Sequence, residues 1–197
     1  MDKKPLHKPR KIKVPKESYL QNVALFYLER FAATAAMLRR VLVRRVERAA
    51  RAGVIDEAGK TEAMAAVELV VKRAVASGLV NDAVYAEARV TSLLRKGKSS
   101  KWMAQDLAER GIAREIQTEA IESLTVIHGD PQSLELEAAL TLARRRRIGP
   151  FRPLDNRSLD ESEIKKRRLR EMGIMARAGF DFGTAAQVID QEASLES

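Results

Sequence analysis

The feature that most limits how this chain can fold is a recurring pattern: a glycine, then a helix-capping residue, then apolar residues three and four apart. Residues 95–99 read Arg-Lys-Gly-Lys-Ser and residues 177–181 read Arg-Ala-Gly-Phe-Asp, and the two segments align without a gap. Glycine can end a helix in the left-handed conformation, and serine or aspartate can begin the next helix by accepting hydrogen bonds from its first amides. The pattern predicts short helices joined by tight turns.

The composition favours the same fold class. Alanine, leucine, arginine, lysine and glutamate are abundant, and aromatic residues make up only 5% of the chain. The abundant residues lose little side-chain entropy in a helix, and few stretches alternate in the way that a β-strand requires. We therefore expect an all-α fold of tandem three-helix repeats that form an elongated, curved helical body.

The expected boundaries follow the glycines, prolines and capping residues. Residues 1–17 carry seven Lys or Arg and three prolines, so we expect a disordered basic tail. A first, divergent three-helix unit is expected over 18–78, a second over 79–127, and a third over 130–192 with an internal loop at 149–160. In the first helix, Val23, Phe26, Tyr27 and Phe31 are expected to form the apolar face. Helix starts are expected at Ser18, Thr34, Asp56, Asn81-Asp82, Ser99-Ser100, Asp130 and Asp181.

Residues that could support catalysis are sparse. The two histidines, His7 and His128, lie far apart, and there is no P-loop, nucleophile elbow or dinucleotide-binding glycine motif. Cysteine is absent, which excludes disulfides and thiolate metal sites. Acidic residues such as Asp106 and Glu109 are interpreted as a solvated helix face. We expect no enzyme activity, no cofactor and no metal site. No apolar run approaches the roughly 20 residues of a membrane span, so we expect no membrane partner and a cytoplasmic location.

The charge favours a polyanionic partner. The chain has 36 Lys and Arg against 27 Asp and Glu, a net charge of +9. The candidate binding residues form three clusters, namely Arg95, Lys96, Lys98 and Lys101, then Arg144, Arg145, Arg146 and Arg147, then Lys165 and Lys166.

Each cluster also has a structural interpretation. Arg95 and Lys96 would complement the end of a helix, whereas Lys98 and Lys101 lie at a helix start, where positive charge is disfavoured. There they could help exposed backbone amides to hold a phosphate or a carboxylate. The run 144–147 spans more than one turn, so at least one arginine should lie inward or along the core edge. Lys165 to Arg168 fit a solvated face, and Trp102 fits core packing better than base stacking.

Residues 78–112, GLVNDAVYAEARVTSLLRKGKSSKWMAQDLAERGI, resemble the core of the RecX regulatory proteins. There a Gly-Leu-apolar-Asp-Asp turn precedes a helix, a Lys-Gly pair, a polar cap and a helix that ends in Gly-Ile. The arginine-rich helix 132–147, the GPFRP loop and the segment RAGFDF at 177–182 also resemble RecX, so the similarity covers about residues 20–190. This chain departs from the family pattern with Asn81-Asp82 for Asp-Asp, Asp181 for serine, and a divergent first unit.

The resemblance implies a modulator of the RecA recombinase. RecX-like proteins lodge in the groove of the RecA–single-stranded DNA filament and inhibit strand exchange, ATP hydrolysis and coprotease activity. On this basis we expect a monomer that binds the filament and single-stranded DNA, with duplex DNA as a further ligand. The alternative is a stand-alone helical DNA-binding protein of the helix-turn-helix type. Acidic side chains on the helix with Trp102 argue against that alternative, because they suit a major groove poorly.

Overall fold

A computed structural model describes residues 12–153 and 160–191. Within these ranges the ordered elements are helices, with no β-strand, which confirms the all-α prediction. Most of the expected basic tail and half of the expected loop lie outside the described residues. The chain divides into two compact units, residues 1–82 and 83–197. None of the helices in the described ranges is long and apolar enough to cross a membrane.

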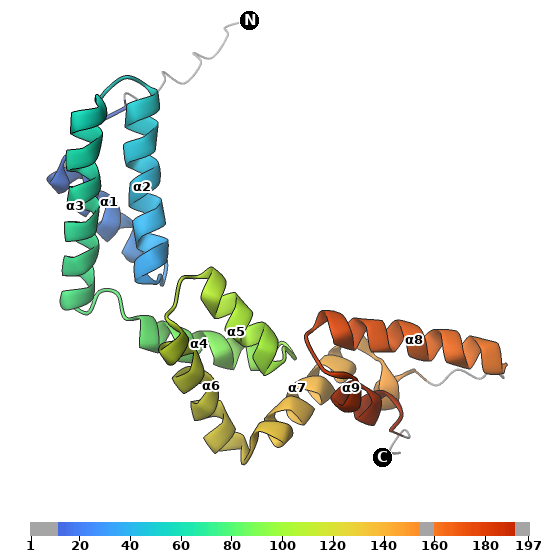
Figure 1. Cartoon of the computed structure of the whole chain (residues 1–197). Helices are drawn as coiled ribbons and strands as arrows, with labels where there is room; N and C mark the ends of the chain where they lie inside the picture. Colours follow the sequence, from blue (N-terminus) through green and yellow to red (C-terminus); the bar gives the residue numbers. More distant parts are fainter. Residues whose placement is uncertain (1–11, 154–159, 192–197) are drawn as a thin grey trace, which may run out of the picture. The chain divides into compact units, whose positions relative to one another are not determined.

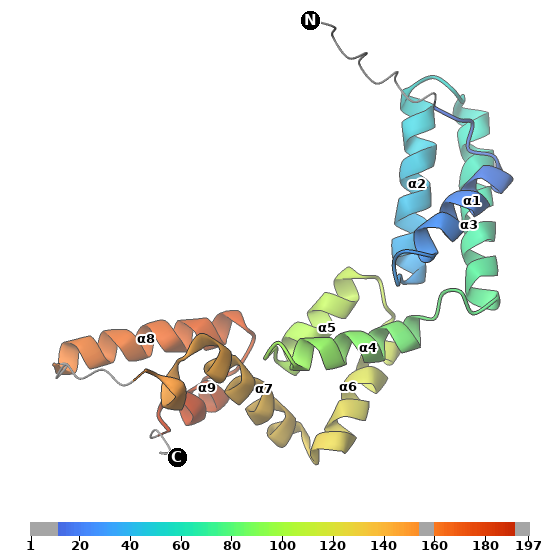
Figure 2. The same cartoon turned by 180° about the vertical axis from the view of Figure 1, so that it is seen from behind.

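Unit 1 contains three helices, α1 (Glu17–Leu28), α2 (Ala35–Arg51) and α3 (Glu57–Ala76). Helices α2 and α3 form an antiparallel hairpin, and α1 crosses one face of it, behind the hairpin in Figure 1 and in front of it in Figure 2. The apolar sides of the three helices meet in one core, in which the largest buried side chains are Leu20, Leu38, Leu42, Val46 and Val67.

The start and the buried face of α1 differ from the prediction. Lys16, not Ser18, precedes the first helical residue, and it provides no side-chain cap. Two residues of the predicted face, Val23 and Tyr27, pack against the core, whereas Phe26 and Phe31 are exposed. The fully buried side chains of α1 are Leu20 and Ala24. Phe26 lies two positions after Ala24, about 200° around the helix and so away from the hairpin. Phe31 follows the end of α1 at Leu28 and is not part of its helical face.

Unit 2 holds the remaining elements around a second apolar core, to which every one of them contributes. Its largest fully buried side chains include Leu93, Met103, Leu107, Leu134 and Met175. The elements are α4 (Asp82–Leu94), α5 (Ser100–Glu109), α6 (Arg114–His128), α7 (Pro131–Arg146), the 3-10 turn η1 (Gly149–Phe151), α8 (Glu161–Arg177) and α9 (Phe182–Ile189). Helix α6, predicted as short, has 15 residues.

The two aligned turns of the sequence have the same backbone hydrogen bonds. After α4 the amide of Lys98 donates to the carbonyl of Leu93 at 3.2 Å, and after α8 the amide of Phe180 donates to that of Met175 at 3.3 Å. In the first turn, Gly97 lies between Leu93 and Lys98 and has a φ of 68°. Ser99 and Asp181 then cap α5 and α9, as predicted. The sequence repeat is therefore a repeated helix–turn–helix geometry.

Candidate interface for an anionic partner

The turn between α4 and α5 presents the first predicted cationic cluster. Arg95, Lys96 and Lys101 are exposed. Lys98 is half-buried, and its ammonium nitrogen lies 4.2 Å from the centroid of the Trp102 ring. That distance is typical of a cation–π contact, so part of this cluster is held in place by the indole. Trp102 itself packs against the core of unit 2, as its predicted structural role requires.

This turn lies against α7. A Cβ atom added to Gly97 would stand 2.5 Å from the backbone nitrogen of Leu142, a separation that side chains do not adopt. Glycine is thus required here for close approach as well as for its positive φ. The contact places Arg95 and Lys96 beside the part of α7 that leads into the arginine run.

The arginine run ends α7. All four residues of the run, Arg144 to Arg147, are exposed, and none forms an ion pair with a described residue. The guanidinium carbon of Arg144 lies 4.8 Å from the ring centroid of Phe151, which packs on the core. Arg147 adopts the left-handed conformation with φ of 54° and closes the helix. No arginine of the run lies inward, and the nearest approach to the expected core-edge position is this contact of the exposed Arg144 with Phe151.

Two backbone amides at the start of α5 already have hydrogen-bond partners. The backbone amide of Ser100 donates to a carboxylate oxygen of Glu135 at 2.6 Å, and that of Trp102 donates to the Ser99 hydroxyl at 3.1 Å. These two amides are therefore not available to a phosphate, because α7 and the cap supply their acceptors. An anion would instead meet the side chains of what we call the cationic surface, namely Arg95, Lys96, Lys98, Lys101, Arg144, Arg145, Arg146 and Arg147.

Lys165 and Lys166 lie apart from the cationic surface. Both are exposed in the first turns of α8, and Lys165 pairs with Glu161 at 3.4 Å. Ala178, which follows α8, contacts the α4–α5 turn through Ser99. Lys166 precedes Ala178 by 12 positions, so about 18 Å of helix separates Lys166 from this contact. The structure thus brings two of the three predicted clusters together and leaves the third on a separate part of unit 2.

Comparison with known proteins gives the family. Residues 81–121 match the family model of the RecX second three-helix domain. The regulatory protein RecX of Myxococcus xanthus (strain DK1622) is 36% identical over 189 residues, which cover 96% of this chain and 94% of that protein. The chain belongs to the RecX family. The regulatory protein RecX of Agrobacterium fabrum (strain C58 / ATCC 33970) is 31% identical over 172 residues, covering 87% of this chain and 82% of that protein.

Two crystal structures of RecX proteins share the fold. RecX from Lactobacillus salivarius superposes with a TM-score of 0.56 at 20% identity, over 88% of this chain and 94% of that one. A second RecX structure gives a TM-score of 0.55 at 19% identity, over 89% of this chain and 72% of that one. Sequence similarity at this level supports the RecX fold and no finer detail of the site.

The sequence did not predict two buried carboxylates in this RecX-family chain. Asp106, interpreted there as solvated, is 6% exposed and accepts hydrogen bonds from Arg89 and Arg110 at 2.7 Å. Burial alone would raise the pKa of Asp106, but the hydrogen bonds and charges of the two arginines outweigh it and lower the pKa to about 2. The four-residue spacing from Asp106 to Arg110 was the available sequence signal.

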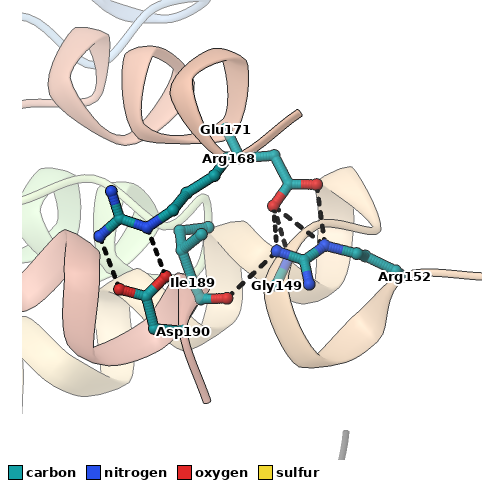
Figure 3. Close-up of polar contacts among 6 residues, drawn as sticks. All are labelled: Gly149, Arg152, Arg168, Glu171, Ile189 and Asp190. Carbon is teal, nitrogen blue, oxygen red and sulfur yellow. Dashed lines mark hydrogen bonds and ion pairs between the residues drawn. The ribbon is translucent and has the colours of Figure 1, made fainter. Parts of the chain in front are cut away.

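The second buried carboxylate is Glu171 of α8. It accepts hydrogen bonds from the side chain of Arg152 and the backbone amide of Gly149, as Figure 3 shows. Arg152 also donates to the carbonyl of Ile189 at 3.1 Å. This arginine therefore joins η1 to α8 and α9, next to the arginine run. Both carboxylates stabilise the scaffold of the cationic surface and leave its charges free for a partner.

Proposed function

We propose that this chain is a regulator that binds the RecA–single-stranded DNA filament and mainly inhibits its recombinase, ATPase and coprotease activities. The observation that carries the proposal is the match over nearly the whole chain to a protein named regulatory protein RecX. We propose further that it acts as a monomer in the cytoplasm, built from three-helix units at 18–78, 79–127 and 130–192.

The cationic surface supports the choice of an anionic partner. Its eight cations come from two segments that are 43 or more residues apart in sequence, and the contact of Gly97 with Leu142 brings these segments close together. Side chains that carry charge without an ion-pair partner attract phosphates and carboxylates at low salt. A filament of protein on DNA presents both kinds of group.

The test is the single-stranded-DNA-dependent ATPase activity of RecA. We expect this chain at substoichiometric amounts to suppress ATP hydrolysis. The double variant Arg145→Ala/Arg146→Ala should need roughly tenfold more protein for the same inhibition, because two phosphate or carboxylate contacts are lost. Arg144 and Arg147 are left in place, since they contact Phe151 and close α7.

The matched control is Arg114→Ala/Arg170→Ala, which removes two exposed arginines of unit 2 outside the cationic surface. It should inhibit as the unaltered chain does. Unchanged ATP hydrolysis at equimolar or greater protein would exclude the proposed function. Co-sedimentation at rising salt distinguishes the proposed function from the alternative, a stand-alone DNA-binding protein. Such a protein would sediment with naked duplex DNA as well as with filaments, and its binding would depend on the DNA sequence.

A further inference from the structure

Unit 1 contains a groove that could not be predicted from the sequence. It has a volume of about 390 Å³ and lies between α1, α2 and the segment that precedes α1. Its polar and aromatic lining consists of Lys13, Tyr19, Asn22, Phe26, Arg45 and Arg48. Three of these six side chains are cations, and the lining contains no carboxylate. The groove is therefore suited to an anion.

The charges of the two arginines in the groove are not neutralised by carboxylates of the described residues. Helix α2 carries six arginines and a single glutamate. That glutamate, Glu47, pairs with Lys60 of α3 at 3.1 Å, on the hairpin side. Arg45 and Arg48 are exposed, and neither forms an ion pair with any residue in the described part of the chain. Because no carboxylate neutralises them, the two guanidinium groups can receive phosphate oxygens.

The aromatic side chains give the groove a second property. Phe26 is 61% exposed, although it is a large apolar residue. The guanidinium carbon of Arg30 lies 3.6 Å from the centroid of its ring, and Lys13 lies 5.9 Å from that of Tyr19. Phe26 contributes to the groove rather than to the core of unit 1. Arg30, which also pairs with Glu29 at 3.9 Å, covers one face of the Phe26 ring. The rest of this exposed ring lies in the same groove as Arg45 and Arg48, and it can stack on a planar group whose charge these two cations neutralise.

We propose that this groove binds single-stranded nucleic acid, with phosphates at Arg45, Arg48 and Lys13 and one unstacked base against the ring of Phe26. A single strand is favoured over a duplex because paired, stacked bases cannot present a face to a side chain. It is favoured over an acidic protein segment because carboxylates would engage the cations and leave Phe26 without a role. Binding of single-stranded DNA is what the family resemblance implies, and the proposal adds the groove and the residues that would bind the strand without a filament.

The experiment measures fluorescence anisotropy of a 15-nucleotide oligothymidine, and of an abasic strand of equal length, with the full chain and no RecA. The unaltered chain should bind oligothymidine roughly tenfold more tightly than the abasic strand, as expected for one stacked base. In Phe26→Ala this preference should vanish, and in Phe26→Trp it should persist. Arg45→Ala/Arg48→Ala should weaken both strands alike and lower the salt slope by about 1.4.

The matched control is Phe182→Ala, which removes another exposed phenylalanine, from unit 2, and should keep the preference. Circular dichroism should show equal helix content in all variants, because Phe26 and Phe182 lie outside both cores. The proposal is overturned if Phe26→Ala retains the preference for oligothymidine. It is also overturned if polyglutamate displaces the strand equally well from the unaltered chain and from Phe26→Ala. Since RecA is absent, neither result depends on the outcome of the ATPase test.

Discussion

The hydroxyl of Ser99 donates a hydrogen bond of 3.1 Å to the carbonyl oxygen of Ala178, 79 residues further along the chain. The same hydroxyl oxygen accepts a hydrogen bond from the backbone amide of Trp102 at 3.1 Å. One side chain therefore caps the start of α5 and satisfies a carbonyl at the end of α8. A Cβ on Gly179 would overlap this hydroxyl, so the two turns that align in sequence also lie against each other in unit 2.

Replacing Ser99 with alanine should destabilise unit 2 by about 2 kcal/mol, because a helix cap and a buried hydrogen bond are lost together. Ser100→Ala is the neighbouring control: its side chain caps nothing, and it should change stability by less than about 0.5 kcal/mol. Urea unfolding followed by the fluorescence of Trp102 measures both. Equal unfolding midpoints for the two variants would contradict the dual role of Ser99.

Gly97 and Gly53 provide a comparison between crowding and backbone strain. Their φ angles are 68° and 66°, but a Cβ at Gly53 meets nothing within 4 Å, whereas one at Gly97 meets the backbone of Leu142. Gly53→Ala should cost about 1 kcal/mol, from the left-handed conformation alone. Gly97→Ala should cost about 3 kcal/mol or more, because α7 must also move.

Hydrogen exchange measures the effects of these two substitutions on different amides, because Gly53 follows α2 in unit 1 and Gly97 follows α4 in unit 2. Amides of α2 should lose little protection in Gly53→Ala. Amides of α4 and α7 should lose much more in Gly97→Ala. Similar losses of protection in the two variants would mean that the contact of Gly97 with Leu142 does not contribute to the stability of unit 2.

The local features of the fold could be predicted from the sequence. Thr34, Asp56, Ser99, Asp130 and Asp181 cap helices as expected. A cap depends on one side chain and on amides two or three residues further along the chain, so the necessary information is contiguous. The ends of the helices at glycine were predictable for the same reason.

Features that depend on tertiary packing could not be predicted. Phe26 matched an apolar face by spacing, but the contact with α2 and α3 selects Leu20 and Ala24 for burial. The spacing of Asp106 and Arg110 could indicate their ion pair but not its burial, because the second partner, Arg89, is 17 residues away on another helix. The cationic surface likewise depends on the contact of Gly97 with α7, and only that contact decides which clusters lie together.

The stability of unit 2 should depend on pH through Asp106. Its pKa lies at about 2, below the ordinary value of 3.8, because hydrogen bonds from Arg89 and Arg110 outweigh the effect of burial. A lowered folded-state pKa stabilises the folded state above the unfolded pKa, near 4, and this contribution is lost as the pH falls towards 2. The loss should be about 2 kcal/mol, measured as the free energy of unfolding in urea between pH 5 and pH 2.

Asp106→Asn should remove most of that pH dependence and lower stability by about 2 to 3 kcal/mol at pH 7, since two arginines lose their shared carboxylate. Asp181→Asn is the control. Hydrogen bonds from Thr184 lower the pKa of Asp181, but this residue is exposed and asparagine caps helices equally well. Its variant should retain the steep fall in stability below pH 4. A parallel pH profile for Asp106→Asn would show that other carboxylates cause the dependence.

Two arginine–carboxylate pairs around α8 and α9 differ in burial and in one further hydrogen bond, which Arg152 donates to the carbonyl of Ile189. Glu171 is 3% exposed and pairs with Arg152, whereas the carboxylate of Asp190 is about half exposed and pairs with Arg168, as Figure 3 shows. Each arginine donates hydrogen bonds from two nitrogens, Nε and Nη2, to the carboxylate of its partner. The hydrogen-bond geometry is therefore similar, and the solvent around the carboxylate is the variable.

Arg152→Ala should destabilise unit 2 by about 3 kcal/mol, because the buried carboxylate of Glu171 would keep a single backbone donor, Gly149. Arg168→Ala should cost less than about 1 kcal/mol, because water solvates the carboxylate of Asp190 once the arginine is gone. Arg152→Ala/Glu171→Met should recover much of the loss by removing the unpaired charge together with its partner. Thermal unfolding of the four proteins measures the comparison. Equal losses for Arg152→Ala and Arg168→Ala would show that burial of Glu171 does not set the strength of its pair.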